Sequence, residues 1–318
     1  MSERRKLMLQ APLPFSRREL LARMGGGLGS LGLVSSLDAA GGIQRTHFVP
    51  KAKRIIHLFM NGGPFGPDYF DPKPALTKFA GQKPEGADLR TERPTGGLLA
   101  SPYAYAKHGQ SGLEISDLFP EVARHADKLC VVRSMIGRQP LHGQQNLLLH
   151  TGRVTGLAPS FGSWVSYGLG SESDNLPSYV LLNNDWIPNG GFENFASAFL
   201  PANHSATLLR AKGTTVDNIV PGDPLAIQRK KLDLLAQQDR TFGTNSPQQA
   251  LIESAIRNYE TAFAMQAAVP LVADVSEETE ATQKMYGLHS TDEHQKYYSL
   301  QCLRARRLVE AGVRFIEI

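Results

Sequence analysis

Four stretches of the chain are mainly apolar and have the length of a β-strand. They span residues 54–60, 129–133, 179–182 and 313–318. Between them, apolar residues recur every three or four positions, which predicts amphipathic helices. These helices are expected at residues 117–126, 142–150, 160–168, 224–238 and 251–263, with a last one that a capping box of Ser290 and Glu293 begins and Gly312 ends.

Strands that are apolar along their whole length and alternate with helices are typical of a parallel sheet covered on both faces. The sequence therefore predicts an α/β fold of three layers, α/β/α, around a mainly parallel central sheet. Residues 183–247 are dense in Asn, Pro and Gly, and we interpret them as an irregular insertion that covers one edge of the sheet. Because the last strand ends at Ile318 with no following loop, we expect the fold to be incomplete at its C-terminus.

The N-terminus has the pattern of a signal peptide. Arg17 and Arg18 precede a Gly-rich apolar run over residues 24–37, and small residues follow at 39–41. An arginine pair before such a run is typical of the twin-arginine export route. Residues 1–41 are thus predicted to be a twin-arginine signal peptide, and residues 42–318 an exported domain, periplasmic or on the cell surface. An ordinary basic N-terminal arm is the alternative.

Most of the net charge of +4 belongs to this leader. Residues 1–40 hold six Lys and Arg against three Asp and Glu, which leaves +1 for the remaining chain. A nucleic-acid-binding protein concentrates basic residues on its folded surface, so no nucleic acid partner is expected. No later stretch approaches the roughly 18 uninterrupted apolar residues of a membrane-spanning helix, so no transmembrane segment is expected either.

The loop after the first predicted strand carries one candidate for chemistry. It begins Asn61-Gly62-Gly63-Pro64 and continues through Asp68 and Asp71. Two glycines let the backbone approach a ligand closely, and a carboxylate is a hard oxygen ligand for a divalent cation. A simple Asp-Pro turn at Asp71 explains the same residues equally well.

A second candidate lies on the helix predicted at 142–150. His142, Asn146 and His150 recur every four residues, so their side chains share one helical face. Two imidazoles and an amide on one face could line a metal or anion site, or form a plain polar stripe with His150 at the helix end. His57 lies within an apolar strand and is interpreted as a core histidine.

The chain has two cysteines, Cys130 and Cys302, which are interpreted as small core residues. Two cysteines exclude a thiolate zinc cluster. Beyond the leader, the chain also lacks the GxSxG, P-loop, GxGxxG and HExxH motifs. Their absence argues against the serine hydrolases, nucleotide-binding proteins and zinc proteases that carry them.

Several short motifs extend over most of the chain after the leader. They are Met60-Asn61-Gly62-Gly63-Pro64, Asp68-Tyr69-Phe70-Asp71-Pro72-Lys73-Pro74, Val132-Arg133-Ser134-Met135, His150-Thr151-Gly152, Pro159-Ser160-Phe161-Gly162-Ser163-Trp164 and Ala311-Gly312-Val313-Arg314-Phe315. Together with the leader, they closely resemble the exported family called domain of unknown function 1501 (DUF1501). That family is grouped with the alkaline phosphatase and sulfatase superfamily.

The resemblance implies an alkaline phosphatase-like fold with a divalent metal at the strand ends. Asp68 matches the position of a metal-binding Asp in that superfamily, and His142 is expected to contact the same metal. The remaining candidates are expected to bind the substrate or its anionic group: Asn61, Gly62, Gly63 and Asn146. The resemblance does not distinguish zinc, calcium, magnesium and manganese.

The sequence departs from the superfamily pattern at three points. Phe65 and Gly66 stand where relatives commonly carry Ser and a polar residue such as His. No Ser or Thr stands at the predicted helix start, His142-Gly143, where a nucleophile is expected. The later Asp and His metal ligands of the family fall beyond Ile318. We therefore expect an incomplete metal site, without an identified catalytic residue.

Two functions are compatible with these features. The first is a metal-dependent hydrolase that acts outside the cytoplasm on phosphate or sulfate esters of small molecules or polysaccharides. The second is a non-catalytic exported protein that keeps the fold for binding or assembly. Both functions require the twin-arginine export machinery as a partner.

Overall fold

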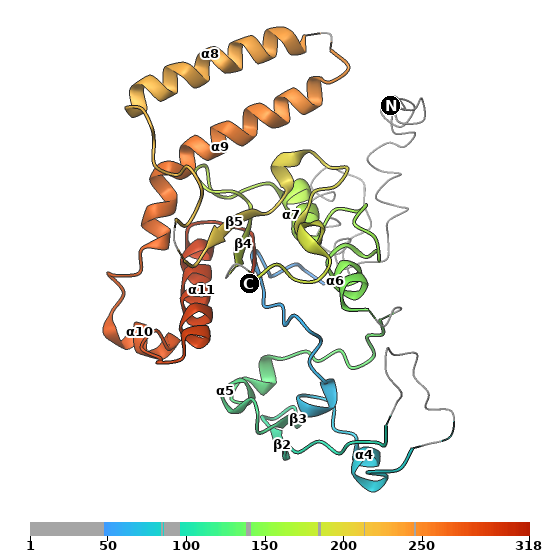
Figure 1. Cartoon of the computed structure of the whole chain (residues 1–318). Helices are drawn as coiled ribbons and strands as arrows, with labels where there is room; N and C mark the ends of the chain where they lie inside the picture. The colour runs from blue at the N-terminus through green and yellow to red at the C-terminus, as the bar shows by residue number, and fades with distance from the viewer. Residues whose placement is uncertain are drawn as a thin grey trace. The chain divides into compact units, whose positions relative to one another are not determined.

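The computed structural model of the chain describes residues 48–83, 85, 96–137, 141–183, 186–212, 214–244 and 246–318 (Figure 1). The chain divides into two compact units. One combines the residues up to Phe59 with Asn146–Ile318, and the other is Met60–Gln145. The predicted leader, residues 1–41, lies outside the described residues.

The first unit contains a four-stranded parallel sheet. In spatial order, its strands are β1 (Ile55–His57), β6 (Phe315–Glu317), β4 (Tyr179–Asn183) and β5 (Thr207–Arg210). Every neighbouring pair runs parallel, which confirms the predicted mainly parallel sheet. The order places β6 between β1 and β4, in the interior of the sheet.

Helices pack on both faces of this sheet. The two faces are named here after their helices: the α11 face is covered by α9 (Gln249–Ala273) and α11 (Glu293–Glu310), and the α7 face by α7 (Phe161–Leu169). The other helices are α6 (His142–Thr151), which begins in the second unit, α8 (Leu225–Gly243) and α10 (Glu280–Tyr286). The predicted helices at 142–150, 160–168 and 251–263 are confirmed as α6, α7 and α9.

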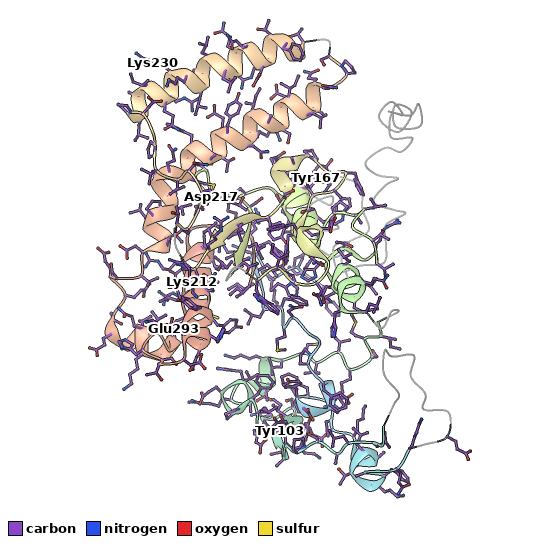
Figure 2. The ribbon with its side chains drawn as sticks, viewed as in Figure 1. Tyr103, Tyr167, Lys212, Asp217, Lys230 and Glu293 are labelled. Atoms are coloured by element: carbon purple, nitrogen blue, oxygen red, sulfur yellow. The ribbon has the colours of Figure 1, made fainter. Side chains whose placement is uncertain are left out.

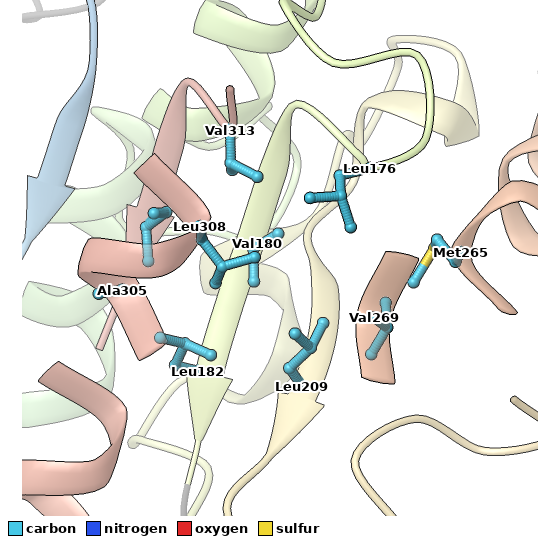
Figure 3. Close-up of a cluster of buried hydrophobic side chains, with 10 residues drawn as sticks. Leu176, Val180, Leu182, Leu209, Met265, Val269, Ala305, Leu308 and Val313 are labelled. Carbon is cyan, nitrogen blue, oxygen red and sulfur yellow. The ribbon is translucent and has the colours of Figure 1, made fainter. Parts of the chain in front are cut away.

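The α11 face carries the larger apolar cluster of the sheet. Val180 and Leu182 of β4 meet Leu209 of β5 and Ile316 of β6 in a cluster that α9 and α11 close (Figure 3). None of these four side chains is more than 2% exposed. Since successive strand residues point to opposite faces, the residues between them face α7.

The α7 face combines an apolar cluster with polar side chains at the ends of its strands. Tyr179, Leu181 and Phe315 pack there with Val165 of α7. Glu317 follows Phe315 two residues later along β6, so the same alternation places a carboxylate on this face.

A helical hairpin, α8 and α9, extends from this unit. The guanidinium of Arg229 on α8 binds both carboxylate oxygens of Glu260 on α9, at 2.6 and 2.7 Å (Figure 2, where Lys230 marks α8).

Among the described residues, no helix combines the length and the apolar character needed to cross a membrane.

The second unit contains a small antiparallel sheet of β2 (Tyr105–His108) and β3 (Leu113–Ser116). Its helical segments are α4 (Pro74–Lys78), α5 (Pro120–Ala123) and the 3-10 turns Gly66–Asp68 and Ala126–Lys128. The helix predicted over residues 117–126 is therefore shorter than expected and ends at Ala123.

Two predictions of the sequence pattern are wrong. Residues 129–133 form no strand, and Cys130 is exposed, as is Val132, so Cys130 is not the core residue that the sequence predicts. An apolar run becomes a strand only where a neighbouring strand takes its backbone hydrogen bonds, and among the described residues no strand pairs with residues 129–133. The segment 183–247, interpreted as an irregular insertion, contributes β5, an edge strand of the sheet.

The start of α11 also differs from the prediction. Asp292, not Ser290, is the N-cap, and its carboxylate accepts hydrogen bonds from the backbone N–H groups of His294 and Gln295. The hydroxyl of Ser290 donates instead to the side chain of Gln295. A carboxylate at this position also interacts favourably with the helix dipole.

Leu209 tests the placement of β5. Its side chain is 1% exposed, so Leu209→Ala should lower the free energy of unfolding by about 2–5 kcal/mol. Leu234→Ala removes the same atoms from a side chain that is 57% exposed and should cost less than about 0.5 kcal/mol. Equal effects of the two variants in urea titrations would show that β5 does not belong to the core.

Candidate metal site

Strand register brings an acid and an imidazole together on the α7 face. Glu317 of β6 lies directly opposite His57 of β1. Both residues end their strands, at the edge of a parallel sheet where ligands usually bind. Glu317 is only 2% exposed, which is rare for an acidic residue without partners.

Helix α6 supplies a second imidazole. His150, in the last turn of α6, has its Nε2 atom 2.6 Å from Oε1 of Glu317, and Nδ1 of His57 lies 3.0 Å from the same oxygen. The other carboxylate oxygen, Oε2, accepts a hydrogen bond of 2.9 Å from the phenol of Tyr179. These four residues, His57, His150, Tyr179 and Glu317, are called the Glu317 cluster below.

Aromatic rings surround the imidazoles. The ring of Phe59 meets His150 edge-on at 4.6 Å between centroids, and Phe195 meets it at 5.4 Å. Phe315 lies 6.5 Å from the ring of His57. Such apolar surroundings lower the local dielectric and strengthen the electrostatic interactions inside the cluster.

The carboxyl group of Glu317 is ionised in these surroundings. Burial raises its pKa, but the hydrogen bonds from His150 and His57 outweigh burial and lower the pKa to about 2. Burial, together with the charge of Glu317, raises the pKa of Tyr179 well above its usual value, so the phenol stays a donor. An ionised carboxylate buried to this degree needs a cation beside it.

The ring of His150 limits what this cation can be. Nδ1 lies 2.7 Å from the backbone carbonyl of Asn146, which only accepts, so Nδ1 carries a proton. Nε2 faces the carboxylate, which also only accepts. A proton on Nε2 makes this 2.6 Å contact a hydrogen bond, whereas a metal ion bound by both atoms requires them to move apart. Donation of one ring N–H to a carbonyl, with the other nitrogen presented inward, is the usual second-shell arrangement of a metal-binding histidine.

The ligand atoms of the cluster fit a divalent metal. The donor atoms of His57, His150 and Glu317 all lie within 4.8 Å of one another. Two imidazoles and one carboxylate form the protein ligand set of several catalytic zinc sites, which keep a fourth position open. Ligands of tetrahedral zinc lie about 3.3 Å apart, so the hydrogen-bonded contacts need to open by less than about 1 Å.

Comparison with protein families connects this site to known sequences. A family model described as "Protein of unknown function (DUF1501)" matches residues 52–318. The chain belongs to this family. The resemblance to DUF1501 inferred from the motifs is thereby confirmed, and the matched range contains His57, His150 and Glu317. Neither the curated proteins nor the solved structures compared with the chain gave a match.

Most of the site residues predicted from the DUF1501 resemblance lie in the second unit. There, Gly62 and Gly63 have φ values of +98° and +67°, a backbone that favours glycine. The ring of His142 lies 4.0 Å from the position that a Cβ atom on Gly63 would occupy. The residues concerned are Asn61, Gly62, Gly63, Asp68 and His142, and their roles toward metal or anion stay predictions.

Asn146 belongs to the first unit, where its side chain and its backbone carbonyl form hydrogen bonds within the protein. Its side-chain nitrogen donates to the carbonyl of Asn189 at 3.0 Å, and its own carbonyl accepts from His150. Asn146 therefore ties a loop to α6 and orients His150. Its predicted contact with an anion stays untested.

Three residues of the Glu317 cluster are not among the predicted site residues. The sequence indicates a core histidine at His57, and Tyr179 and Glu317 lie in predicted strands without a predicted role. His57 and Glu317 interrupt short apolar strands with a polar side chain, in Ile55-Ile56-His57-Leu58 and in Phe315-Ile316-Glu317-Ile318. Because a buried polar group is costly without a partner, two such interruptions in strands of one sheet were the available signal.

The cluster predicts a stability effect at Glu317. Glu317→Gln removes the charge that pairs with the imidazoles, so the free energy of unfolding measured in EDTA should fall by about 3 kcal/mol. Glu310→Gln is the matched control, because the Glu310 side chain is 64% exposed in its ion pair with Arg306, and it should cost less than about 1 kcal/mol. If both variants unfold at the same denaturant concentration, the buried pairing does not stabilise the fold.

Proposed function

We propose that this chain is an exported metal-dependent hydrolase of phosphate or sulfate esters, of the alkaline phosphatase and sulfatase type. The observation that carries the proposal is the orientation of His150: its Nδ1–H is committed to Asn146, which leaves Nε2 aimed at an ionised, buried carboxylate. A proton on Nε2 or a metal ion satisfies that pair, and the proposal assigns this place to a metal ion. His57, His150 and Glu317 would hold the divalent metal.

The exposure of the three ligands gives the direction from which a substrate would approach. The side chains of His150 and Glu317 are 2% and 3% exposed, whereas that of His57 is 31% exposed. The cluster is thus closed on the side of α6 and open beside β1. An ester entering beside His57 would reach the carboxyl ends of the strands, where parallel sheets bind ligands.

The chain's own residues would orient and insulate the site. Asn146 fixes the ring of His150, and Phe59 and Phe195 exclude water from it. A divalent metal supplies Lewis acidity, which polarises an ester oxygen and makes an attacking water more acidic. Electrostatic stabilisation of this kind is strongest where water is excluded.

Location and substrate class rest on the sequence. The arginine pair before the apolar run supports export by the twin-arginine route to the periplasm or cell surface. There the substrate would be a small-molecule or polysaccharide ester. Asp68 and His142 are proposed as metal ligands in the second unit, from the superfamily resemblance.

A non-catalytic binding or assembly protein is the second candidate. It is favoured by one observation: both oxygens of Glu317 already accept hydrogen bonds from protein donors. The hydroxyl of Thr151, next to His150, is likewise used, because it donates to the carbonyl of Leu147 at 2.7 Å. In this case the cluster would serve stability alone.

Metal titration with an activity assay separates the two candidates. We expect the purified chain to bind zinc or manganese, and His150→Gln to lose that binding, while His289→Gln, at an exposed histidine, keeps it. We also expect turnover of p-nitrophenyl phosphate, p-nitrophenyl sulfate or a sulfated polysaccharide in the metal-loaded protein.

The results of the metal titration and of the activity assay distinguish the two candidate functions. Binding that depends on His150 without turnover of any of these esters would favour the non-catalytic candidate. Absence of binding, or equal binding by both histidine variants, would contradict a metal at the Glu317 cluster.

A further inference from the structure

Tyr179 is the one member of the Glu317 cluster that is not a proposed metal ligand. It begins β4, pairs with Phe315 of β6 in the sheet register, and is 1% exposed. Glu317 stands two residues beyond Phe315 on the same face, so the phenol reaches along the strand to the carboxylate. Its O–H donates to Oε2 of Glu317 at 2.9 Å.

The ring of Tyr179 is held from two sides. Phe315 meets it edge-on at 5.2 Å, with the ring planes at 88°. On another side, the first turn of α7 lies so close that a Cβ atom on Gly162 would stand 2.5 Å from Cζ of the ring. Only glycine allows this approach, so α7 packs directly on the phenol end of the side chain.

This packing gives the two carboxylate oxygens of Glu317 different partners. Oε1 faces both imidazoles, and Oε2 faces a donor that is fixed in place. As long as the phenol is bonded to Oε2, the carboxylate offers a single oxygen to a cation that lies between the imidazoles.

We propose that Tyr179 is a positioning residue that makes Glu317 a one-oxygen ligand and thereby selects a metal of low coordination number. The inference rests on the proposed metal at the Glu317 cluster and goes further, because it names the class of ion: zinc, or cobalt in its place, rather than calcium or magnesium.

The ligand chemistry supports this selection. Calcium takes six to eight oxygen ligands and often uses both oxygens of a carboxylate, and magnesium requires an octahedron of oxygens. The Glu317 cluster offers two nitrogens and one oxygen, and its neighbours Phe59 and Phe195 carry no donor atom. Zinc accepts such a set with one position left open.

Tyr179→Phe tests the role directly. Without the phenol, both carboxylate oxygens can turn to the metal. Competition with a chromophoric chelator should show zinc affinity reduced about 10- to 100-fold. Cobalt bound in place of zinc should change from the intense visible absorption of four-coordinate Co²⁺ to the weaker bands of a higher coordination number. Tyr259→Phe is the control, since it removes a tyrosine–carboxylate hydrogen bond to Asp239, and it should change neither measurement.

The outcomes distinguish the role of Tyr179 from the existence of the metal site. Wild-type protein that binds zinc, with Tyr179→Phe equal to wild type in affinity and cobalt spectrum, would overturn the role of Tyr179 and leave the proposed metal site intact. If the variant does not fold, the wild type decides: a six-coordinate cobalt spectrum, or displacement of zinc by millimolar calcium, would also overturn the inference. Failure of the wild type to bind zinc and cobalt at all would contradict the proposed function itself.

Discussion

The carboxylate of Glu317 lies on an interior strand, β6, between β1 and β4, where water does not solvate its charge. A charge in that position is compatible with a folded protein only when hydrogen-bond donors and a cation surround it. The surroundings of Glu317 meet this need from three elements: β1 contributes His57, α6 contributes His150 and β4 contributes Tyr179. Two helices are placed accordingly: α6 presents the imidazole of His150 to the carboxylate, and Gly162 of α7 leaves room for the phenol of Tyr179.

The two faces of the sheet divide stability and chemistry between them. On the α11 face a cluster of buried apolar side chains joins the sheet to α9 and α11, and the burial of this cluster stabilises their association. The α7 face buries less apolar surface, because part of it is occupied by a carboxylate and two imidazoles. A polar group enclosed by an apolar shell is the arrangement in which an ion is bound tightly and orients its surroundings.

The periodic parts of the chain could be predicted from sequence, and the isolated ones could not. Helices α6, α7 and α9 are long enough for a 3.6-residue pattern to be visible, and β4 is apolar up to its last residue, Asn183. β5 has only four residues within a polar region, so no period marks it. Residues 129–133 show the converse: an apolar run is not a strand unless a partner strand lies beside it.

The residues of the site could likewise be predicted only where a local sequence pattern marks them. His150 was a candidate because helical spacing is a local property, which the chain reveals by itself. His57 and Glu317 are 260 residues apart and become neighbours only through the register of β1 and β6, which no local pattern encodes. Each looked like a single polar residue in an apolar strand, and only the sheet makes them a pair.

The central claim is that a cation must lie between Nε2 of His150 and the carboxylate of Glu317, and that a divalent metal takes this place. Nitrogen NMR of protein labelled with ¹⁵N-histidine measures the state of both ring nitrogens, with His150→Gln assigning the signal. The account predicts that in EDTA both nitrogens of His150 carry protons, and that zinc removes the proton from Nε2 while Nδ1 keeps its own. A bare Nδ1 in EDTA, or a His150 signal that zinc leaves unchanged, would contradict it.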